Sequence, residues 1–535
     1  MAKKLQKLAM CFCLDNMKLV VYIAILFCSA HLFGQTKVSS KLYAKDLKLA
    51  NTAFEQEDYL NAINFYRKVL AIDLNNETSH LNSVISRLNL NQAPDSSYNH
   101  IVKLKNSKTP EVLFYFGKFY HLTSNFEQAI KYYTNYRAIA IKERAITNDD
   151  VDYHIACSKN AIDLISQPHR SIIKNVGNVI NSSFAEYVPL ITPDESLMYF
   201  TSRREGSTGN LKDAYNAYYE DVYVSQKMED GKWGTPKNIG APINTNTHDA
   251  CVALSFDGNQ LMIYKTSDDK LTGDLYMTRI SFNGWTTPEK IGAEINTPFI
   301  ETSACFSSDT SVIFFSSNKP GGFGGKDIYR IKKLPNGRWS MPLNLGATIN
   351  TYKDEDAPFL HPDGTTLYFS SKGHNTMGEY DVFKTILNQE TNTFSPPENL
   401  GFPINTVNND IFFVLNANGT HGYYSSVKEE TFGGSDIYMI DTRFGDNDLK
   451  VKHGVVMFGN EVSKAKITII DTESKQVSGI YNANSKTGKF ILVVNPVKPY
   501  KAIIEEDGFQ TMIVDIEPLA NEQFEKDLII ILTKK

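Results

Sequence analysis

Five acidic residues stand at the same position of a recurring phrase, and their spacing suggests a common chemical role. Each follows, by four residues, a Thr or Ser that closes a phrase similar to N-L-G-A-T-I-N-T; they are Glu186, Asp249, Glu301, Glu355 and Asp410. Carboxylate oxygens at one level of a channel would hold a calcium ion or attract a basic partner. In a structural role, each carboxylate accepts hydrogen bonds from backbone amides and fastens one repeat to the next. One acid in a fixed slot of every repeat favours the structural role, with calcium binding as the alternative.

The acids belong to repeats that are marked by an Asp, an aliphatic residue and an aromatic residue. The triplet begins at Asp221, Asp274, Asp327, Asp381 and Asp436, so successive repeats are 53 to 55 residues apart. Its Asp follows Gly-rich sequence such as G-G-F-G-G-K, where a side-chain acceptor would order the turn. Each repeat also has a segment that ends in two hydroxyl residues, Thr266-Ser267 in the second repeat. A further segment carries an aromatic residue, namely Trp233, Trp285, Trp339 or Phe394.

Four short strands per repeat at this period predict the blades of an all-β propeller, with the tryptophans packed between blades. The fifth repeat lacks the closing phrase, and its counterpart at Asn175-Val-Gly177 precedes the first repeat. A strand around 171–176 should therefore complete the last blade, because ring closure removes the open sheet edges. This predicts a five-bladed propeller over residues 171–445. The turns, the Y-F-S-S-like segments and the G-G-x-D-I-Y triplets resemble the PD40 repeats, which form WD40-like propellers.

Residues 35–170 have the hydrophobic period of helices. Two segments share one pattern: a small residue, an Ala twelve positions later and a Tyr four positions after that Ala. The first segment has Ala50, Ala62 and Tyr66, and the second has Gly117, Ala129 and Tyr133. The pattern resembles the tetratricopeptide repeat, whose arrays offer a concave face to peptides or partner proteins. A plain stack of helical hairpins that only covers the next domain is the alternative.

Residues 449–535 return to short strands separated by turns, such as K-A-K-I-T-I-I-D-T and D-L-I-I-I-L. This pattern predicts a small β-sandwich. The phrases T-G-K-F and E-D-G-F-Q resemble the carboxypeptidase regulatory-like domain, a class of spacer and interaction modules.

The N-terminus resembles a secretory signal. Lys18 precedes the apolar run L-V-V-Y-I-A-I-L-F-C-S-A-H-L-F-G, which is short for a membrane span, and polar sequence follows from Gln35. Residues 1–34 are therefore predicted to be a signal peptide, with Met1 or Met17 as its start. An uncleaved anchor and a lipid on Cys28 are the alternatives.

Composition and motifs argue against several functions. The net charge is -5 with 21% charged residues, and no basic patch interleaved with aromatic residues indicates nucleic-acid binding. The cysteines beyond the signal, Cys157, Cys251 and Cys305, are odd in number and form no C-x-x-C, so we expect buried thiols and neither disulfides nor a metal site. The sequence has no G-x-S-x-G, H-E-x-x-H or P-loop motif, so we expect no enzyme and no cofactor.

The order of these segments resembles the PorE-like envelope proteins of bacteria with two membranes. The resemblance implies an accessory role in type IX secretion or gliding, envelope proteins as partners, and a location in the periplasm or at the periplasmic face of the outer membrane. Those proteins usually continue into an OmpA-like domain that grips peptidoglycan. This sequence contains no such domain, so peptidoglycan binding is not expected. The leading hypothesis is a non-catalytic envelope scaffold, and the alternative is a propeller that binds calcium or a glycan at its acidic mouth.

Overall fold

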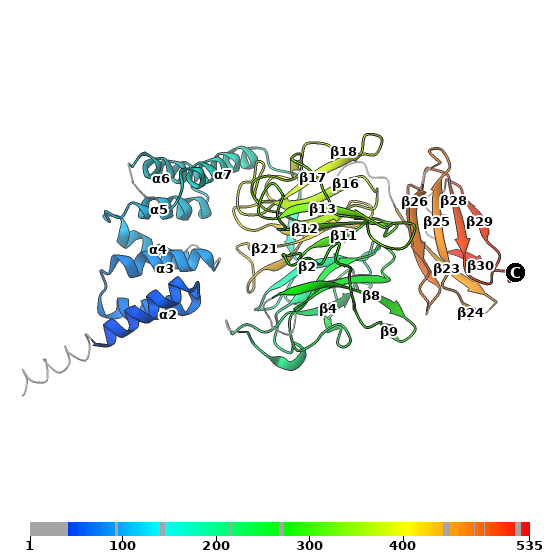
Figure 1. Ribbon diagram of the computed structural model, residues 1–535, viewed down its shortest axis with the longest axis horizontal. Helices are drawn as coiled ribbons and strands as arrows, with labels where there is room; N and C mark the ends of the chain where they lie inside the picture. The colour runs from blue at the N-terminus through cyan, green and yellow to red at the C-terminus, as the bar shows by residue number, and fades with distance from the viewer. Residues whose placement is uncertain are drawn as a thin grey trace, which may run out of the picture. The chain divides into compact units, whose positions relative to one another are not determined.

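The computed structural model describes residues 41–90, 95–139, 145–213, 216–266, 272–441, 450–459, 461–475, 477–485, 487–518 and 526–535. The predicted signal peptide and Cys28 lie outside these ranges. The chain divides into two compact units, Met1–Asp152 and Tyr153–Lys535, which we describe separately (Figure 1). Within the described ranges no helix is both long and apolar enough to cross a bilayer.

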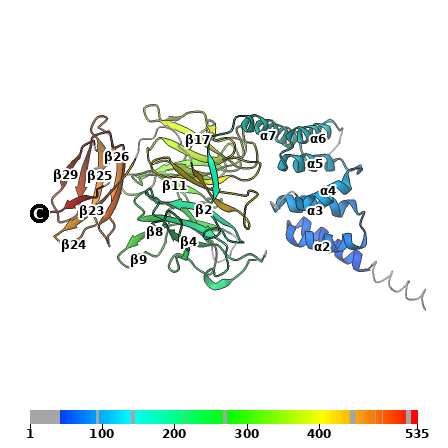
Figure 2. The same ribbon diagram turned by 180° about the vertical axis from the view of Figure 1, so that it is seen from behind.

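The N-terminal unit is helical. Residues 41–55 form a helix, followed by α2 (Tyr59–Ile72), α3 (Glu77–Asn89), α4 (Asp95–Ile101), η1 (Val102–Leu104), α5 (Glu111–Leu122), α6 (Phe126–Ala138) and the start of α7 (Asn148–Ser166). Helices α2 and α3, α3 and α4, and α5 and α6 lie against each other, as Figure 2 shows from behind. Asp58 and Asn76 cap α2 and α3 by accepting the backbone N–H of the residue three positions on, at 3.2 and 2.9 Å.

The small residues identified in the sequence lie where helices approach closely. Ala50, Ala62 and Tyr66 share one buried cluster. In the second hairpin, a methyl group added to Gly117 would lie 2.5 Å from the ring of Tyr133. The predicted pairing of a small residue with a Tyr is therefore confirmed in both hairpins.

The described part of residues 171–441 contains five antiparallel sheets, which we number in chain order as sheets 1 to 5. Sheet 1 contains β2 (Glu186–Ile191), β3 (Leu197–Ser202), β4 (Asp221–Gln226) and β5 (Lys237–Asn238). Sheet 2 contains β6 (Asp249–Leu254), β7 (Gln260–Thr266), β8 (Gly273–Ser281), β9 (Gly284–Trp285) and β10 (Glu289–Lys290). Sheet 3 contains β11 (Ala304–Phe306), β12 (Val312–Ser317), β13 (Asp327–Lys332) and β14 (Leu343–Asn344).

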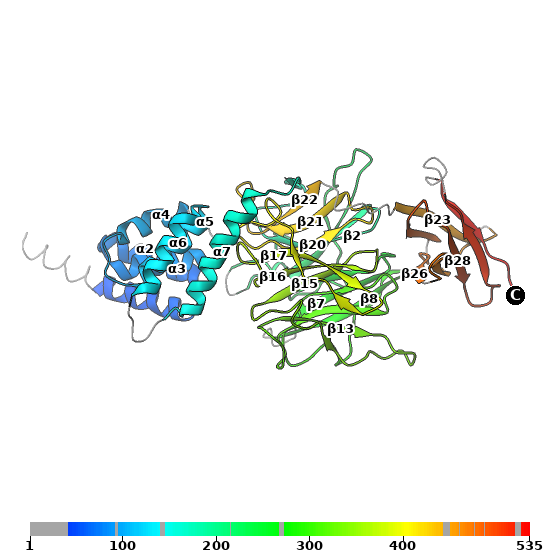
Figure 3. The ribbon, with the colours of Figure 1, turned by 90° about the horizontal axis from the view of Figure 1, so that it is seen from above.

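Sheet 4 contains β15 (Glu355–Leu360), β16 (Thr366–Ser371), β17 (Asp381–Asn388), β18 (Thr393–Phe394) and β19 (Glu398–Asn399). Sheet 5 contains β20 (Ile411–Leu415), β21 (His421–Ser426) and β22 (Asp436–Asp441), which lie side by side in Figure 3. Its outer strand is β1 (Ile172–Asn175), which comes from the start of the region and pairs with β22 from Ile172↔Asp441 to Asn175↔Tyr438. The strand expected around residues 171–176 thus forms and pairs as predicted.

The sheets are arranged as in a β-propeller. The first strand of each sheet contacts the first strand of the next, and β20 of sheet 5 contacts β2 of sheet 1. Apolar clusters join neighbouring sheets, and rings cross the interfaces: Trp285 meets Tyr199 at 6.1 Å, Trp233 meets Tyr423 at 6.0 Å and Phe394 meets Phe314 at 6.4 Å between ring centroids. Packing of Trp233 and Trp285 between repeats is therefore confirmed.

The described part of residues 450–535 forms two further sheets. One contains β23 (Lys450–Phe458), β24 (Glu461–Val462), β27 (Lys489–Val494) and β30 (Leu528–Ile531), and the other β25 (Lys466–Asp471), β26 (Val477–Asn482), β28 (Tyr500–Glu505) and β29 (Met512–Ile516). Ile467 and Ala502 from one sheet share a core with Val456 and Leu492 from the other. Two sheets around one apolar core form a β-sandwich.

Candidate functional site

The five predicted acids are buried at the starts of the first strands. Glu186, Asp249 and Glu355 are the first residues of β2, β6 and β15, while Glu301 and Asp410 lie just before β11 and β20. Their exposed fractions range from 0 to 3%. Among the residues that the structure describes, no group of three or more His, Cys, Asp or Glu side chains is placed to hold a metal ion. The acids are thus equivalent in position but are not gathered into one ligand set.

Glu355 shows how each carboxylate is bonded. Thr351 donates both its backbone N–H and its hydroxyl to Glu355, each at 2.7 Å. Ser371, the last residue of the second strand, donates its hydroxyl at 2.7 Å. The same three donors recur for Glu186, Glu301 and Asp410. Each acid therefore fastens the phrase before it to the second strand of its own sheet, which is the structural role favoured by the sequence.

Sheet 2 departs from this pattern at its serine position. In sheet 1, the second-strand residue that pairs with the triplet residue Asp221 is Ser202. In sheet 2, the residue that pairs with the triplet residue Asp274 is Lys265, which precedes the expected hydroxyl pair. The lysine ammonium takes the place of the serine hydroxyl and donates to Asp249. The hydroxyl pair proposed from the sequence for this repeat was therefore wrong in register.

Cations accompany some of these buried carboxylates. Arg204 lies 3.1 Å from Glu186, Lys265 contacts Asp249, and Lys428 lies 3.7 Å from Asp410. Within the described residues Glu355 has no ion-pair partner, and burial raises its pKa to about 7. The protonation state of Glu355 is thus sensitive to pH near neutrality.

A second hydrogen-bond network fixes the triplet. In sheet 3, Asp327 accepts the backbone N–H groups of Phe323 and Gly324 at 2.7 and 3.0 Å, so it orders the Gly-rich turn as predicted. Asn344 donates to Asp327 at 2.6 Å. Asn350 then bonds both the N–H and the carbonyl of Ile328 and donates to Asn344.

No role was predicted for these asparagines, although both recur in the phrases that precede four of the five acids. Equivalent bonds occur in sheets 1, 4 and 5. In sheet 2 Lys290 replaces the first asparagine and pairs with Asp274 at 2.7 Å. The recurrence of Asn in two fixed positions was the signal that could have revealed this network.

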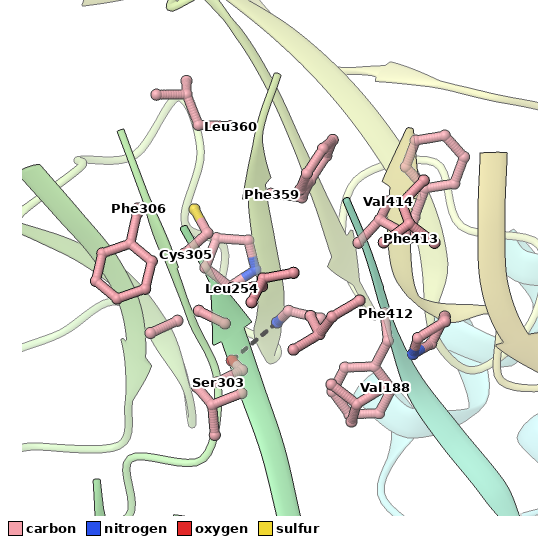
Figure 4. A pocket seen from close by; sticks show the side chains of 18 of the residues that line it. Val188, Leu254, Ser303, Cys305, Phe306, Phe359, Leu360, Phe412, Phe413 and Val414 are labelled. Carbon is pink, nitrogen blue, oxygen red and sulfur yellow. Dashed lines mark hydrogen bonds between the residues drawn. The ribbon is translucent and has the colours of Figure 1, made fainter. Parts of the chain in front are cut away.

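The first strands of all five sheets line a central cavity (Figure 4). Its walls are mainly apolar and include Val188, Leu254, Phe306, Phe359 and Phe412. Its volume is about 60 Å³, which is room for a few water-sized molecules. Cys305 belongs to this wall, and burial raises its pKa to about 12, so its thiol is unreactive at neutral pH.

Three residues of the cavity wall have strained backbones. Val188, Ala357 and Phe412 have φ values of 51°, 49° and 60°, a left-handed conformation that residues other than Gly rarely adopt. Each lies at a register shift between the first and second strands of its sheet. Pro189 and Pro358 follow two of them and bring no N–H group to the wall, so the cavity stays apolar.

Polar side chains near the beginning of the first strands are bonded to one another. Tyr187 donates to Glu220, whose other oxygen lies 3.0 Å from Nδ1 of His248. Lys326 pairs with Asp356 at 2.7 Å, and Ser303 donates to the same carboxylate. These contacts balance charge locally.

The described cysteines Cys157, Cys251 and Cys305 are free and buried, as expected.

No family model and no curated protein matches the chain. Several solved structures are similar to a part of the chain. The α-L-arabinofuranosidase from Lactobacillus brevis is 12% identical, covers 50% of this chain and 92% of its own, and has a TM-score of 0.32. The Bacteroides ovatus xyloglucan PUL GH43B protein is 11% identical, with coverage of 66% and 93% and a TM-score of 0.33. The β-propeller domain of the trilobed protease from Pyrococcus furiosus is 10% identical, with coverage of 65% and 88% and a TM-score of 0.25. Similarity of this size does not assign an activity to the chain.

Proposed function

We propose that the chain is a non-catalytic scaffold of the cell envelope that binds protein partners. Its parts are a tetratricopeptide-like domain (35–170), a five-bladed PD40 propeller (171–445) and a carboxypeptidase regulatory-like sandwich (449–535). The observation that carries the proposal is that the repeated acids are buried and accept hydrogen bonds from neighbouring backbone and serine groups. Such acids hold a binding platform together.

The ring of contacts supports five blades. Each first strand touches the next, and β1 supplies the fourth strand of sheet 5. A closed ring leaves no long sheet edge for uncontrolled pairing, which suits a platform in a crowded compartment.

The helical domain is the part that we assign to partner binding. Its hairpins pack through paired small and aromatic residues, which is the arrangement of superhelical repeat arrays. Phe116, Tyr120 and Tyr132 stack on each other with centroids 5.0 to 6.3 Å apart. Tyr98 is 52% exposed beside Phe119. Aromatic side chains are frequent anchors in protein interfaces.

The test is cross-linking in cells that express the tagged chain, followed by mass spectrometry of the envelope fraction. Recovery of secretion or gliding components would support the accessory role implied by the PorE-like resemblance. The variant Gly117→Leu, which distorts the α5–α6 hairpin, should lose the partners, whereas Lys131→Ala on the exposed face of α6 should keep them. Recovery of the same proteins with an untagged control strain would refute the proposal.

Calcium at the acidic residues is the alternative function. Cation binding at Glu355 would have to displace hydrogen bonds from Thr351 and Ser371, and the same holds at the equivalent acids. The bonding pattern therefore favours the scaffold, and chelation of calcium separates the two functions.

A further inference from the structure

The interface between sheets 5 and 1 contains a partly buried network of polar side chains. The carboxylate of Glu195 lies 3.0 Å from Nδ1 of His421 and 2.6 Å from the ammonium of Lys227. Lys227 also lies 5.7 Å from the ring centroid of Trp233, and Trp233 packs edge to face on Tyr423. This interface therefore contains the carboxylate of Glu195 and the ring of Tyr423.

The interface between sheets 2 and 3 has the same positions with different residues. Lys333 forms an isolated β-bridge with Trp339, as Lys227 does with Trp233. Thr310 and Glu195 occupy the same turn, and both have a φ of 54°. Strand register gives the other equivalences. In sheet 2, Gln260 replaces His421 and Met262 replaces Tyr423. In sheet 3, Thr310 replaces Glu195, Lys333 replaces Lys227 and Trp339 replaces Trp233.

Two groups are therefore missing from the interface of sheets 2 and 3. Thr310 has no carboxylate with which to neutralise Lys333, and Met262 provides no ring to meet Trp339. Within the described chain, Trp339 makes no aromatic ring contact and Lys333 pairs with no acidic side chain. A pocket of about 340 Å³ lies at this interface, a volume in the range of small-molecule sites.

The lining of this pocket combines apolar and basic side chains. Phe306, Met277 and Trp339 line it together with Arg279 and Lys333. Arg279 occupies the position of Asp441 in sheet 5, since Gln260 pairs with Arg279 as His421 pairs with Asp441. Its one side-chain hydrogen bond is a 3.5 Å contact with Gln260, and within the described residues it forms no ion pair with a carboxylate.

The other charged groups of the lining do not cancel this excess. Lys290 is already paired with Asp274, which leaves Glu289 against the two basic residues Arg279 and Lys333. The pocket is therefore net positive beside a partly exposed aromatic ring, which favours an anion attached to a ring.

We propose that the pocket between sheets 2 and 3 binds a small molecule in which a carboxylate is attached to a ring. The carboxylate takes the place that Glu195 fills between sheets 5 and 1, and it pairs with Lys333 and Arg279. The ring packs on Trp339, which makes no aromatic contact within the described chain. An aromatic acid and a uronic acid sugar share this chemistry. The site is separate from the repeated acids and from the helical domain, and it goes beyond the scaffold function.

Calorimetric titration of the purified chain tests the site with phenylacetate, D-glucuronate, phenylacetamide and acetate. We expect one or both ring carboxylates to bind at least tenfold more tightly than phenylacetamide, which lacks the charge, and acetate, which lacks the ring. Whichever of phenylacetate and D-glucuronate binds more tightly shows whether the ligand is an aromatic acid or a uronic acid sugar. Failure of both ring carboxylates to bind, or equal binding of phenylacetamide, would overturn the proposal.

Variants locate the binding. Lys333→Gln, Arg279→Gln and Trp339→Ala should each weaken binding at least tenfold, while Lys332→Gln, an exposed neighbour outside the lining, should not change it. Thr310→Glu restores the internal carboxylate, so it should abolish binding and raise the melting temperature. Unchanged affinity in a folded Thr310→Glu protein would rule out this pocket as the site.

Discussion

Nε2 of His374 lies 2.9 Å from the backbone oxygen of Ile349 in sheet 4. The corresponding carbonyls in sheets 1 and 2, those of Ile180 and Ile243, accept hydrogen bonds from Arg204 and Lys265. Sheet 4 thus has an imidazole where sheets 1 and 2 have a permanent cation. Burial lowers the pKa of His374, so the ring is neutral at pH 7 and leaves Glu355 without a compensating charge.

This arrangement predicts that the propeller loses stability as pH rises toward neutrality. The pKa of Glu355 is about 7 in the fold, above its usual 4.5, so the folded state holds a proton that the unfolded state releases. The stabilising contribution of the protonated group is complete below pH 4.5 and is lost as pH rises through 7, a change of up to about 3 kcal/mol. Calorimetric melting of wild type and Glu355→Gln between pH 4.5 and 8 measures it.

The Glu355→Gln variant should show a flatter dependence of melting temperature on pH than wild type. Glu390→Gln, at an exposed position of the same sheet, serves as the control and should follow the wild-type curve. Parallel curves for wild type and Glu355→Gln would mean that Glu355 is ionised in the fold throughout this range.

The hydroxyl of Ser317 predicts a second stability effect. It donates to the buried carboxylate of Glu301 at 2.6 Å, and Ser317→Ala would leave that carboxylate with one bond fewer away from water. Removing one partner of a buried charged group costs about 1–3 kcal/mol. Urea denaturation should show this loss for Ser317→Ala and almost none for Thr391→Ala, which removes an exposed hydroxyl contact. Equal midpoints for the two variants would argue against the fastening role of the acids.

The repeated roles were predictable from the sequence because each depends on one residue type at one position. A carboxylate four residues after Thr351 meets the amide and hydroxyl of that same phrase, so local spacing alone indicates the contact. Gly117 and Tyr133 were likewise recognisable, because a close helix approach excludes any side chain at the smaller residue.

Features that depend on strand pairing were not predictable in this way. Lys265 was overlooked because Thr266-Ser267 resembles the hydroxyl pairs of other repeats, and only pairing with Asp274 reveals the offset of two residues. Thr310 is informative because it carries no carboxylate. This becomes visible when its turn is compared with that of Glu195 in another sheet. Sequence periodicity gives the positions within a repeat, but it does not show what faces them across an interface.

The contact between His80 and His100 predicts acid sensitivity in the helical unit. Their Nδ1 atoms lie 3.0 Å apart, and Nε2 of His80 lies 3.0 Å from the carbonyl of Leu74. His80 therefore donates through Nε2 and accepts from His100 at Nδ1. Burial, followed by the charges of Arg87 and His80, lowers the pKa of His100 to about 4.

Because the unfolded chain binds the proton near pH 6.5 and the folded chain near 4, stability is lost as pH falls through this interval. Helical circular dichroism during thermal unfolding should show a falling midpoint between pH 6.5 and 4, and His100→Asn should reduce the fall. His453→Gln, at an exposed position in the sandwich, is the control. A midpoint that does not vary with pH would show that both imidazoles are accessible to protons in the folded state.

Gly117 predicts a steric effect that a second change can relieve. A Cβ at this position would lie 2.5 Å from two ring atoms of Tyr133, which is fully buried. Overpacking of this kind costs about 1–3 kcal/mol, so Gly117→Ala should lower the midpoint of the helical transition. The double variant Gly117→Ala/Tyr133→Leu should be less destabilised than the sum of its single changes. Simple additivity would mean that the two residues do not share the predicted contact.

Chelation distinguishes the structural role of the acids from calcium binding. A ligand that binds only the folded state stabilises it in proportion to the logarithm of its concentration over its dissociation constant. Because Glu186, Glu355 and their equivalents already accept hydrogen bonds from Ser or Thr, we expect the melting temperature to be the same in EDTA, in EGTA and in added calcium. A fall in chelator that calcium reverses and magnesium does not would establish a calcium site. If the fall disappeared in Glu355→Gln, the site would include Glu355, and the fastening role would have to be shared with an ion.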